Sequence, residues 1–306
     1  MVLALLGAAP SIADENDAAL YGVVDCRYLM SENPELTHFS ERLGSSWFPQ
    51  GGLFRPPLAD MRQPRFYLSW RSVTFQGSAL PSGGDDRRIR AGVVAMGTDY
   101  GIWRRTGGRR CNGFQVDVMG GIFSQFNLDA ESDDLINTDF LIGPTVSWRR
   151  GGLSLRGRLY HQSSHLGDEF ILDNPNVDRI NLSFEAADVT VSYGRSWWRV
   201  YGGPGAIFGA DPRLEAGTLQ WGFEARAPWR RGTANWAPMF AVDFNSLEER
   251  DWEITTSLMG GIELSNLPGT RRFRVMMIYL DGFIPFGQFF NTERITSLGA
   301  TLQFEL

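Results

Sequence analysis

The sequence has little of what marks several common classes of protein. It contains two cysteines and no Cys-x-x-Cys pair, which excludes the usual zinc-binding and dithiol redox motifs. No run of about 20 apolar residues occurs, so we expect no transmembrane helix. The net charge is −6 and no basic tract stands apart, so we expect no nucleic-acid partner. No glycine-rich loop lies on a strand-to-helix turn, where it would cradle a phosphate.

Alternation of apolar and polar side chains is the dominant pattern. The chain has 35 glycines and 10 tryptophans, and only 21% of its residues are charged. In "GFQVDVMGGIFSQF", Phe114 and Val116 fall on one face, and Gln115 and Asp117 fall on the other. A period of two residues predicts a strand with one apolar and one polar face. The fold is therefore expected to be all-β.

About twelve such strands follow one another from residue 65 to the C-terminus. Most of them exceed the roughly 9–11 residues that a tilted strand needs to cross a bilayer. We therefore predict an antiparallel transmembrane β-barrel, although a soluble barrel with its faces reversed would share the alternation. The expected strands are 65–76, 88–105, 112–127, 135–149, 152–163, 178–193, 197–209, 216–227, 234–245, 251–265, 271–281 and 294–306.

The connections between these strands alternate between short and long, which is typical of outer-membrane barrels with both termini in the periplasm. Three short turns follow Trp-Arg-Arg motifs that begin at Trp103, Trp148 and Trp229 and fit an interfacial aromatic girdle. The last strand, "SLGATLQFEL", resembles the terminal signature that the barrel-insertion machinery reads, with Leu306 in place of the usual aromatic residue. These features predict location in the bacterial outer membrane.

Two segments precede the expected barrel domain of residues 65–306. Residues 1–13 look like the remnant of a signal peptide, because Ser11 and Ala13 are small residues at the −3 and −1 positions of a cut site. Residues 14–64 do not alternate and are rich in proline and glycine, so we expect a periplasmic arm or a plug that enters the barrel. Cys26 and Cys111 would then share the periplasm, where a disulfide between them would persist.

The stretch "RGRLYHQSSHLGDEF" places a histidine and a serine on the lipid-facing side of one strand. His161 and Ser163 share the parity of the outward residues, and His161 lies roughly 20 Å from the short turn. Residues i and i+2 of a strand project from the same face. His161 could therefore take the proton of Ser163 as that serine attacks an acyl ester. Asp168 or Asp178 would orient the imidazole.

Two resemblances accompany this stretch. The His-x-Ser pair resembles the motif of outer-membrane phospholipases and lipid A deacylases, with Ser164 where those families usually carry asparagine. This resemblance implies a serine-type lipid esterase. The segments "LFRPPLADMRQPRFYLSW" and "YHQSSHLGDEF" are similar to a family of uncharacterised exported bacterial proteins, known only as a domain of unknown function. This wider resemblance implies the barrel fold and its location but no activity.

Other interpretations of the same loop stay open. Asp168, Glu169 and Asp173 supply oxygen ligands of the kind that Ca²⁺ prefers. His161 and His165 together with Asp168 would instead suit Zn²⁺. The stretch can equally be a polar strand end without chemistry, so no cofactor is required and Ca²⁺ is an option.

Two functions from different classes follow. The first is an integral outer-membrane protein that serves as a channel or as a structural or assembly component, with another membrane protein as its partner. The second is an outer-leaflet lipid acyl hydrolase, which needs no open lumen. In both cases the expected partners are outer-membrane lipid, lipopolysaccharide and the barrel-insertion machinery.

Overall fold

The computed structural model describes residues 44–49, 51–76, 88–107, 112–175, 177–195, 197–227, 236–265, 272–290 and 292–305. The expected signal segment 1–13 and the expected disulfide between Cys26 and Cys111 lie outside these ranges. Within them, no helix combines the length and the apolar character needed to cross a membrane.

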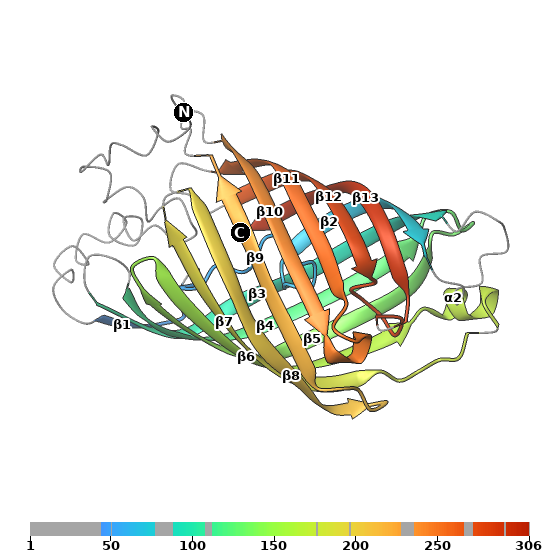
Figure 1. Ribbon diagram of the computed structural model, residues 1–306, viewed down its shortest axis with the longest axis horizontal. Coiled ribbons are helices and arrows are strands. Elements are labelled where there is room, and N and C mark those ends of the chain that lie inside the picture. Colours follow the sequence, from blue (N-terminus) through green and yellow to red (C-terminus); the bar gives the residue numbers. More distant parts are fainter. Residues whose placement is uncertain are drawn as a thin grey trace, which may run out of the picture.

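Twelve antiparallel strands close into a barrel, which confirms the predicted fold (Figure 1). Each strand pairs with the next one along the chain, and β2 also pairs with β13, which closes the ring. The strands are β2 (Phe66–Phe75), β3 (Arg88–Gly107), β4 (Asn112–Asn127), β5 (Asp134–Arg150), β6 (Leu153–Leu166), β7 (Ser183–Arg195), β8 (Trp198–Asp211), β9 (Gly217–Arg226), β10 (Trp236–Leu247), β11 (Ile254–Ser265), β12 (Arg272–Phe283) and β13 (Arg294–Glu305).

The two ends of the barrel differ. Helix α2 (Asp168–Asp173) and the short 3-10 helix η3 (Glu248–Arg250) lie in connections at one end, which we call the long-loop end. The opposite end, which we call the short-turn end, includes the tight connection at Gly151 and Gly152 between β5 and β6. In Figure 1 the long-loop end, with α2, lies on the right.

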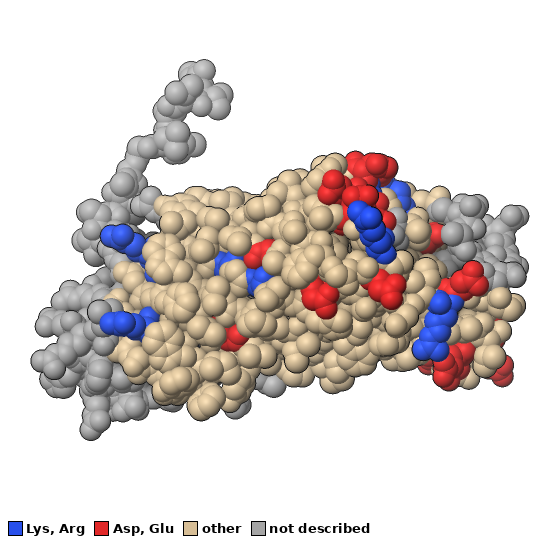
Figure 2. Space-filling model, turned by 90° about the horizontal axis from the view of Figure 1, so that it is seen from below, with Lys and Arg blue, Asp and Glu red and all other residues tan. Residues whose placement is uncertain are grey.

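Alternation along the strands decides which side chains face the lumen. On β4, Gln115 and Asp117 are 0% and 3% exposed, whereas Phe114 and Val118 are each 40% exposed. The outer wall is therefore apolar and the lumen partly polar. This is the arrangement of a transmembrane barrel, and it is the reverse of a soluble one. Figure 2 shows uncharged side chains over most of one face, with acidic side chains gathered towards the long-loop end.

A thirteenth strand, β1 (Gly44–Trp47), lies outside the ring, in a segment where no strand is expected from the alternation. It pairs antiparallel with residues 103–106 of β3. The reason is geometric, because β2 pairs only with residues 88–95 of the long strand β3. β1 covers backbone groups further along the same edge, and an exposed strand edge is a liability in any sheet.

Residues 51–65 cross the lumen between β1 and β2, and we call this segment the plug. Leu58 of the plug is only 2% exposed, and its amide donates to Oε1 of Glu224 on β9 at 2.5 Å. Arg55 of the plug pairs with Glu263 on β11 at 3.5 Å. The plug contacts the wall through a main-chain amide and a side chain, and not through strand pairing, because its prolines and glycines do not continue a sheet.

The described residues of the loop 284–293, between β12 and β13, fold into the lumen at the long-loop end. Phe286 of this loop stacks on Phe123 of β4, with ring centroids 5.4 Å apart. The amide of Gly287 donates to both carboxylate oxygens of Asp139 at 3.1 Å. The plug therefore occupies the lumen towards the short-turn end, and this loop occupies it at the long-loop end.

Candidate functional site

The candidate site lies on the outer wall, where β6 and β7 pair near the long-loop end. His161 on β6 stands opposite Ile142 of β5 and Glu185 of β7. The side chains of His161 and Glu185 are 46% and 44% exposed, so both project away from the lumen. Gln162 and Ser164, the intervening positions of β6, are buried on the lumenal side.

A carboxylate holds the imidazole of His161. Nδ1 of His161 lies 3.1 Å from Oε1 of Glu185. When Nδ1 carries the proton and donates it to Glu185, Nε2 keeps a lone pair with which it can accept a proton. Glu185 is not among the site residues predicted from the sequence. One sequence feature could have identified Glu185: alternation along its strand places it among the lipid-facing residues. A carboxylate is costly there and therefore suggests a specific role.

Ser163 follows His161 by two residues and shares its face. It is half-buried and stands opposite Phe140 of β5 and Ser183 of β7. Within the described residues, the His161 side chain hydrogen-bonds to Glu185 and to no other group. Its second ring nitrogen is therefore free to receive the proton of a nearby hydroxyl, and such catalytic hydrogen bonds often form only with substrate bound.

A β-bulge in β8 leaves room for the Glu185 carboxylate. The pairing of β7 with β8 shifts its register between Ser183 and Glu185. Gly209 lies in the bulged segment with φ = +59°. A Cβ at this position would come within 2.2 Å of Oε2 of Glu185. Glycine at 209 therefore avoids strain in the left-handed backbone and leaves the Glu185 carboxylate in its observed position, which a Cβ would force to shift.

Neither of the two aspartates predicted to orient the imidazole is hydrogen-bonded to His161. Asp168 opens helix α2, is 86% exposed and pairs with Arg179 at 3.8 Å. The main-chain oxygen of Asp178 accepts a hydrogen bond from Gln288 at 2.8 Å. The structure therefore brings Glu185, rather than either aspartate, to the nitrogen Nδ1 of His161.

The predicted metal ligands are not assembled into a site. In the described ranges, no group of three or more His, Cys, Asp or Glu side chains is placed to hold a metal ion. Asp168, Glu169 and Asp173 all lie on the single short helix α2. His165 packs edge-on against Phe140, with ring centroids 5.9 Å apart. Binding of Ca²⁺ or Zn²⁺ stays a prediction.

Several charges inside the barrel are paired across strands. Glu263 of β11 lies 2.9 Å from Arg226 and 2.8 Å from Arg274. Arg158 of β6 pairs with Asp188 of β7 at 2.7 Å. Such pairs bind the strands to one another and, with the plug, fill the lumen.

The barrel resembles those of outer-membrane proteins. The outer membrane phospholipase A from Escherichia coli aligns with a TM-score of 0.51 and 12% identity, covering 82% of this chain and 93% of that chain. The Salmonella typhi outer membrane phospholipase dimer with bound calcium aligns with a TM-score of 0.51 and 11% identity, covering 78% and 90%. At such identities the likeness concerns the fold alone.

Sequence comparison gives one further finding. The profile of a family described as "Protein of unknown function (DUF1207)" matches residues 35–306. No curated protein sequence matches the chain.

Proposed function

Since the chain belongs to the DUF1207 family, whose description assigns no activity, we propose its function from the site itself: hydrolysis of acyl esters of membrane lipids at the outer wall. The observation that carries this proposal is the 3.1 Å contact between Nδ1 of His161 and Oε1 of Glu185, two residues from Ser163 on the same face. A nucleophile, a base and a group that orients the base are the three parts of a serine hydrolase site.

The chemistry follows from these three side chains. The hydroxyl of Ser163 attacks the carbonyl carbon of the ester, and its proton passes to Nε2 of His161. Collapse of the tetrahedral intermediate breaks the bond to the alcohol, which leaves with the proton from His161. Water then attacks the acyl-serine, with His161 again as the base, and releases the fatty acid. Glu185 holds the imidazole and stabilises its cationic form in both halves.

The surroundings of the site suit a lipid substrate. Ile142, opposite His161, is 59% exposed, and Phe140, opposite Ser163, is 42% exposed. On the other side, Phe208 stands opposite Glu185 and is 47% exposed. The polar residues of the site lie nearer the long-loop end than most of the apolar wall. An acyl chain packed along this wall would therefore place its polar ester linkage beside Ser163. With both termini in the periplasm, this position corresponds to the outer leaflet.

An open channel is the second candidate, and the filled lumen disfavours it. Buried contacts of the plug with Glu224 and Glu263 occupy the interior near the short-turn end. At the other end, Phe286 and Gly287 of the loop 284–293 bind to the inner wall. A catalytic site on the outer wall needs no open lumen.

The test is acyl release from phospholipid and lipopolysaccharide by the refolded barrel in mixed micelles. We expect fatty acid release by the wild type and a loss of at least about 10²-fold in Ser163→Ala and in His161→Gln. Each assay is run with Ca²⁺ and with EDTA, because the aligned Salmonella structure contains calcium. Heat-modifiable gel mobility shows that each variant is folded.

Matched controls come from the same two strands. Ser183→Ala removes a serine directly opposite Ser163, and His165→Gln removes the next outward histidine of β6. Both are expected to keep wild-type activity. No release from any acyl lipid by a folded barrel, or equal release by Ser163→Ala, would contradict the proposal and leave a channel or assembly component as the function.

A further inference from the structure

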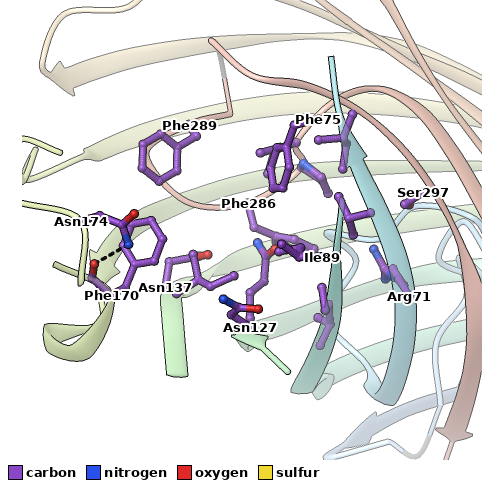
Figure 3. Close-up of a pocket in the computed structure, with 18 residues that line it drawn as sticks. Arg71, Phe75, Ile89, Asn127, Asn137, Phe170, Asn174, Phe286, Phe289 and Ser297 are labelled. Carbon is purple, nitrogen blue, oxygen red and sulfur yellow. Dashed lines mark hydrogen bonds between the residues drawn. The ribbon is translucent and has the colours of Figure 1, made fainter. Parts of the chain in front are cut away.

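A cavity lies inside the barrel near the long-loop end, apart from the proposed catalytic site on the outer wall. Its volume is about 140 Å³. The loop 284–293 forms one wall through Phe286 and Phe289, and β2 and β3 form another through Phe75 and Ile89 (Figure 3). A dry, apolar cavity of about 150 Å³ in another protein binds benzene, so a cavity of this size holds an apolar group of about six carbons.

One cation lines this otherwise mostly apolar cavity. Arg71 of β2 is 4% exposed, and in Figure 3 it lies beside Ser297, on the side away from Phe170 and Asn174. Its Nε donates to the hydroxyl of Ser69 at 2.9 Å, and its guanidinium also bonds to the hydroxyl of Tyr67.

The charge of Arg71 has no counterion among the described residues. The hydroxyl of Tyr67 is itself committed, because it donates to the main-chain oxygen of Met61 at 3.0 Å. Some other lumenal arginines do meet carboxylates, as Arg274 meets Glu263 at 2.8 Å and Arg199 meets Glu224 at 2.6 Å. Arg156 instead bonds to the amide oxygen of Gln63 at 2.9 Å, and it does not line this cavity. A buried guanidinium without an acid is costly, and an anion that enters the cavity would offset this cost.

We propose that this cavity binds a small amphiphilic carboxylate, such as a fatty acid of about six carbons, with its carboxylate on Arg71 and its chain against Phe75, Phe286 and Phe289. A guanidinium binds a carboxylate through two parallel hydrogen bonds, and the aromatic walls cover the apolar chain. The inference does not rest on the proposed hydrolase, because the cavity lies inside the barrel and Ser163 lies outside it.

The test compares hexanoate with hexanamide, which has the same shape and no charge. Binding to the refolded full chain is measured by isothermal titration calorimetry in neutral detergent. We expect hexanoate to bind at least about ten-fold more tightly than hexanamide, because a hydrogen bond to a charged group exceeds a neutral one by about this factor. Arg71→Gln should remove this preference and leave the binding of hexanamide within about three-fold.

A second variant fills the cavity. Ala91 faces the lumen from β3 and lines the cavity, so Ala91→Leu should abolish binding of both compounds. If Ala91→Leu does not fold, Val73→Phe serves as the cavity-filling variant, because Val73 lines the same cavity from β2. Equal affinity for the two compounds, no binding by the folded wild type, or unchanged binding of hexanoate in Arg71→Gln would each overturn the proposal.

Discussion

At the scale of single residues, the site depends on the pairing of His161 with Glu185, which no linear motif reveals. His161 and Ser163 form a recognisable His-x-Ser pattern, and alternation along the strand predicts that both side chains face outward. Glu185 lies 24 positions further on, and only the register of β6 with β7 places it opposite His161. Register depends on the loop between the strands, which alternation alone does not fix.

Gly209 gives a residue-scale prediction. Gly209→Ala places a methyl group where Oε2 of Glu185 lies, and the left-handed backbone adds strain. We expect acyl release to fall by about ten-fold or more while the barrel still folds. Glu185→Gln should cause a comparable loss, and the double variant should be little worse than either single variant, because both act on the same carboxylate.

The control for Gly209→Ala is a substitution at Gly260 of β11, where a Cβ would meet no atom within 4 Å. Gly260→Ala should keep full activity. Full activity in folded Gly209→Ala would show that the position of Glu185 does not matter to the reaction.

At the scale of elements, alternation locates the barrel strands well. The expected strand 112–127 has the observed bounds of β4, and the last strand begins at Arg294 as expected. The expected strand 178–193 instead begins at Ser183. Residues 178–182 precede the ladder, and Asp178 and Ile180 hydrogen-bond to Gln288 of the loop 284–293. A contact between two loops leaves no periodic trace in either sequence.

The strand β1 escapes such reasoning for a different reason. Four residues, GSSW, are too few to show alternation. The strand exists because the edge of β3 is vacant there, and this vacancy arises from the stagger of the whole barrel.

The loop after β4 gives an element-scale prediction about pH. The Asp129 carboxylate accepts hydrogen bonds from the amide of Arg90 at 2.6 Å and from its Nε at 2.5 Å. These bonds hold the pKa of Asp129 below its ordinary value. The contribution to stability is therefore complete above the ordinary carboxyl range and is lost as pH falls through the lowered pKa.

Unfolding in urea, followed by tryptophan fluorescence at pH 6 and pH 3, checks this. The wild type should lose more stability on acidification than Asp129→Asn does. The difference should be below about 1 kcal/mol, because the pair is exposed to solvent. Glu131→Gln, in the same loop, should behave as the wild type. An identical acid response in Asp129→Asn and the wild type would show that this carboxylate contributes nothing.

At the scale of the whole molecule, the main feature is that the plug and the loop 284–293 occupy the interior of the barrel. The sequence predicts a polar lumen and an arm or plug, but it does not indicate which strands the segment contacts. The ion pairs among β8, β9, β11 and β12 depend on three-dimensional order. For example, Arg199 meets both Glu224 and the main-chain oxygen of Arg55 in the plug.

The plug gives a prediction at this scale. A variant that begins at Phe66 lacks β1 and the plug, so Glu224 loses its contact with Leu58 and Glu263 loses its contact with Arg55. We expect the full chain to show no resolved conductance in planar bilayers and the shortened variant to conduct ions. We also expect a lower unfolding temperature, because the barrel loses the hydrogen bonds and the buried apolar contacts that the plug makes with its inner wall. Equal conductance by both would identify the full chain as a channel.

The path of the plug also links strands that lie far apart in the chain. The segment is tied at one end to β3 through β1 and at the other end continues directly into β2, the strand that closes the ring against β13. Its contacts lie on β9 and β11, in the middle of the chain. The plug therefore joins the first, the middle and the last strands of the barrel to one another. A force on any of these strands would be passed straight across the lumen as well as around the wall.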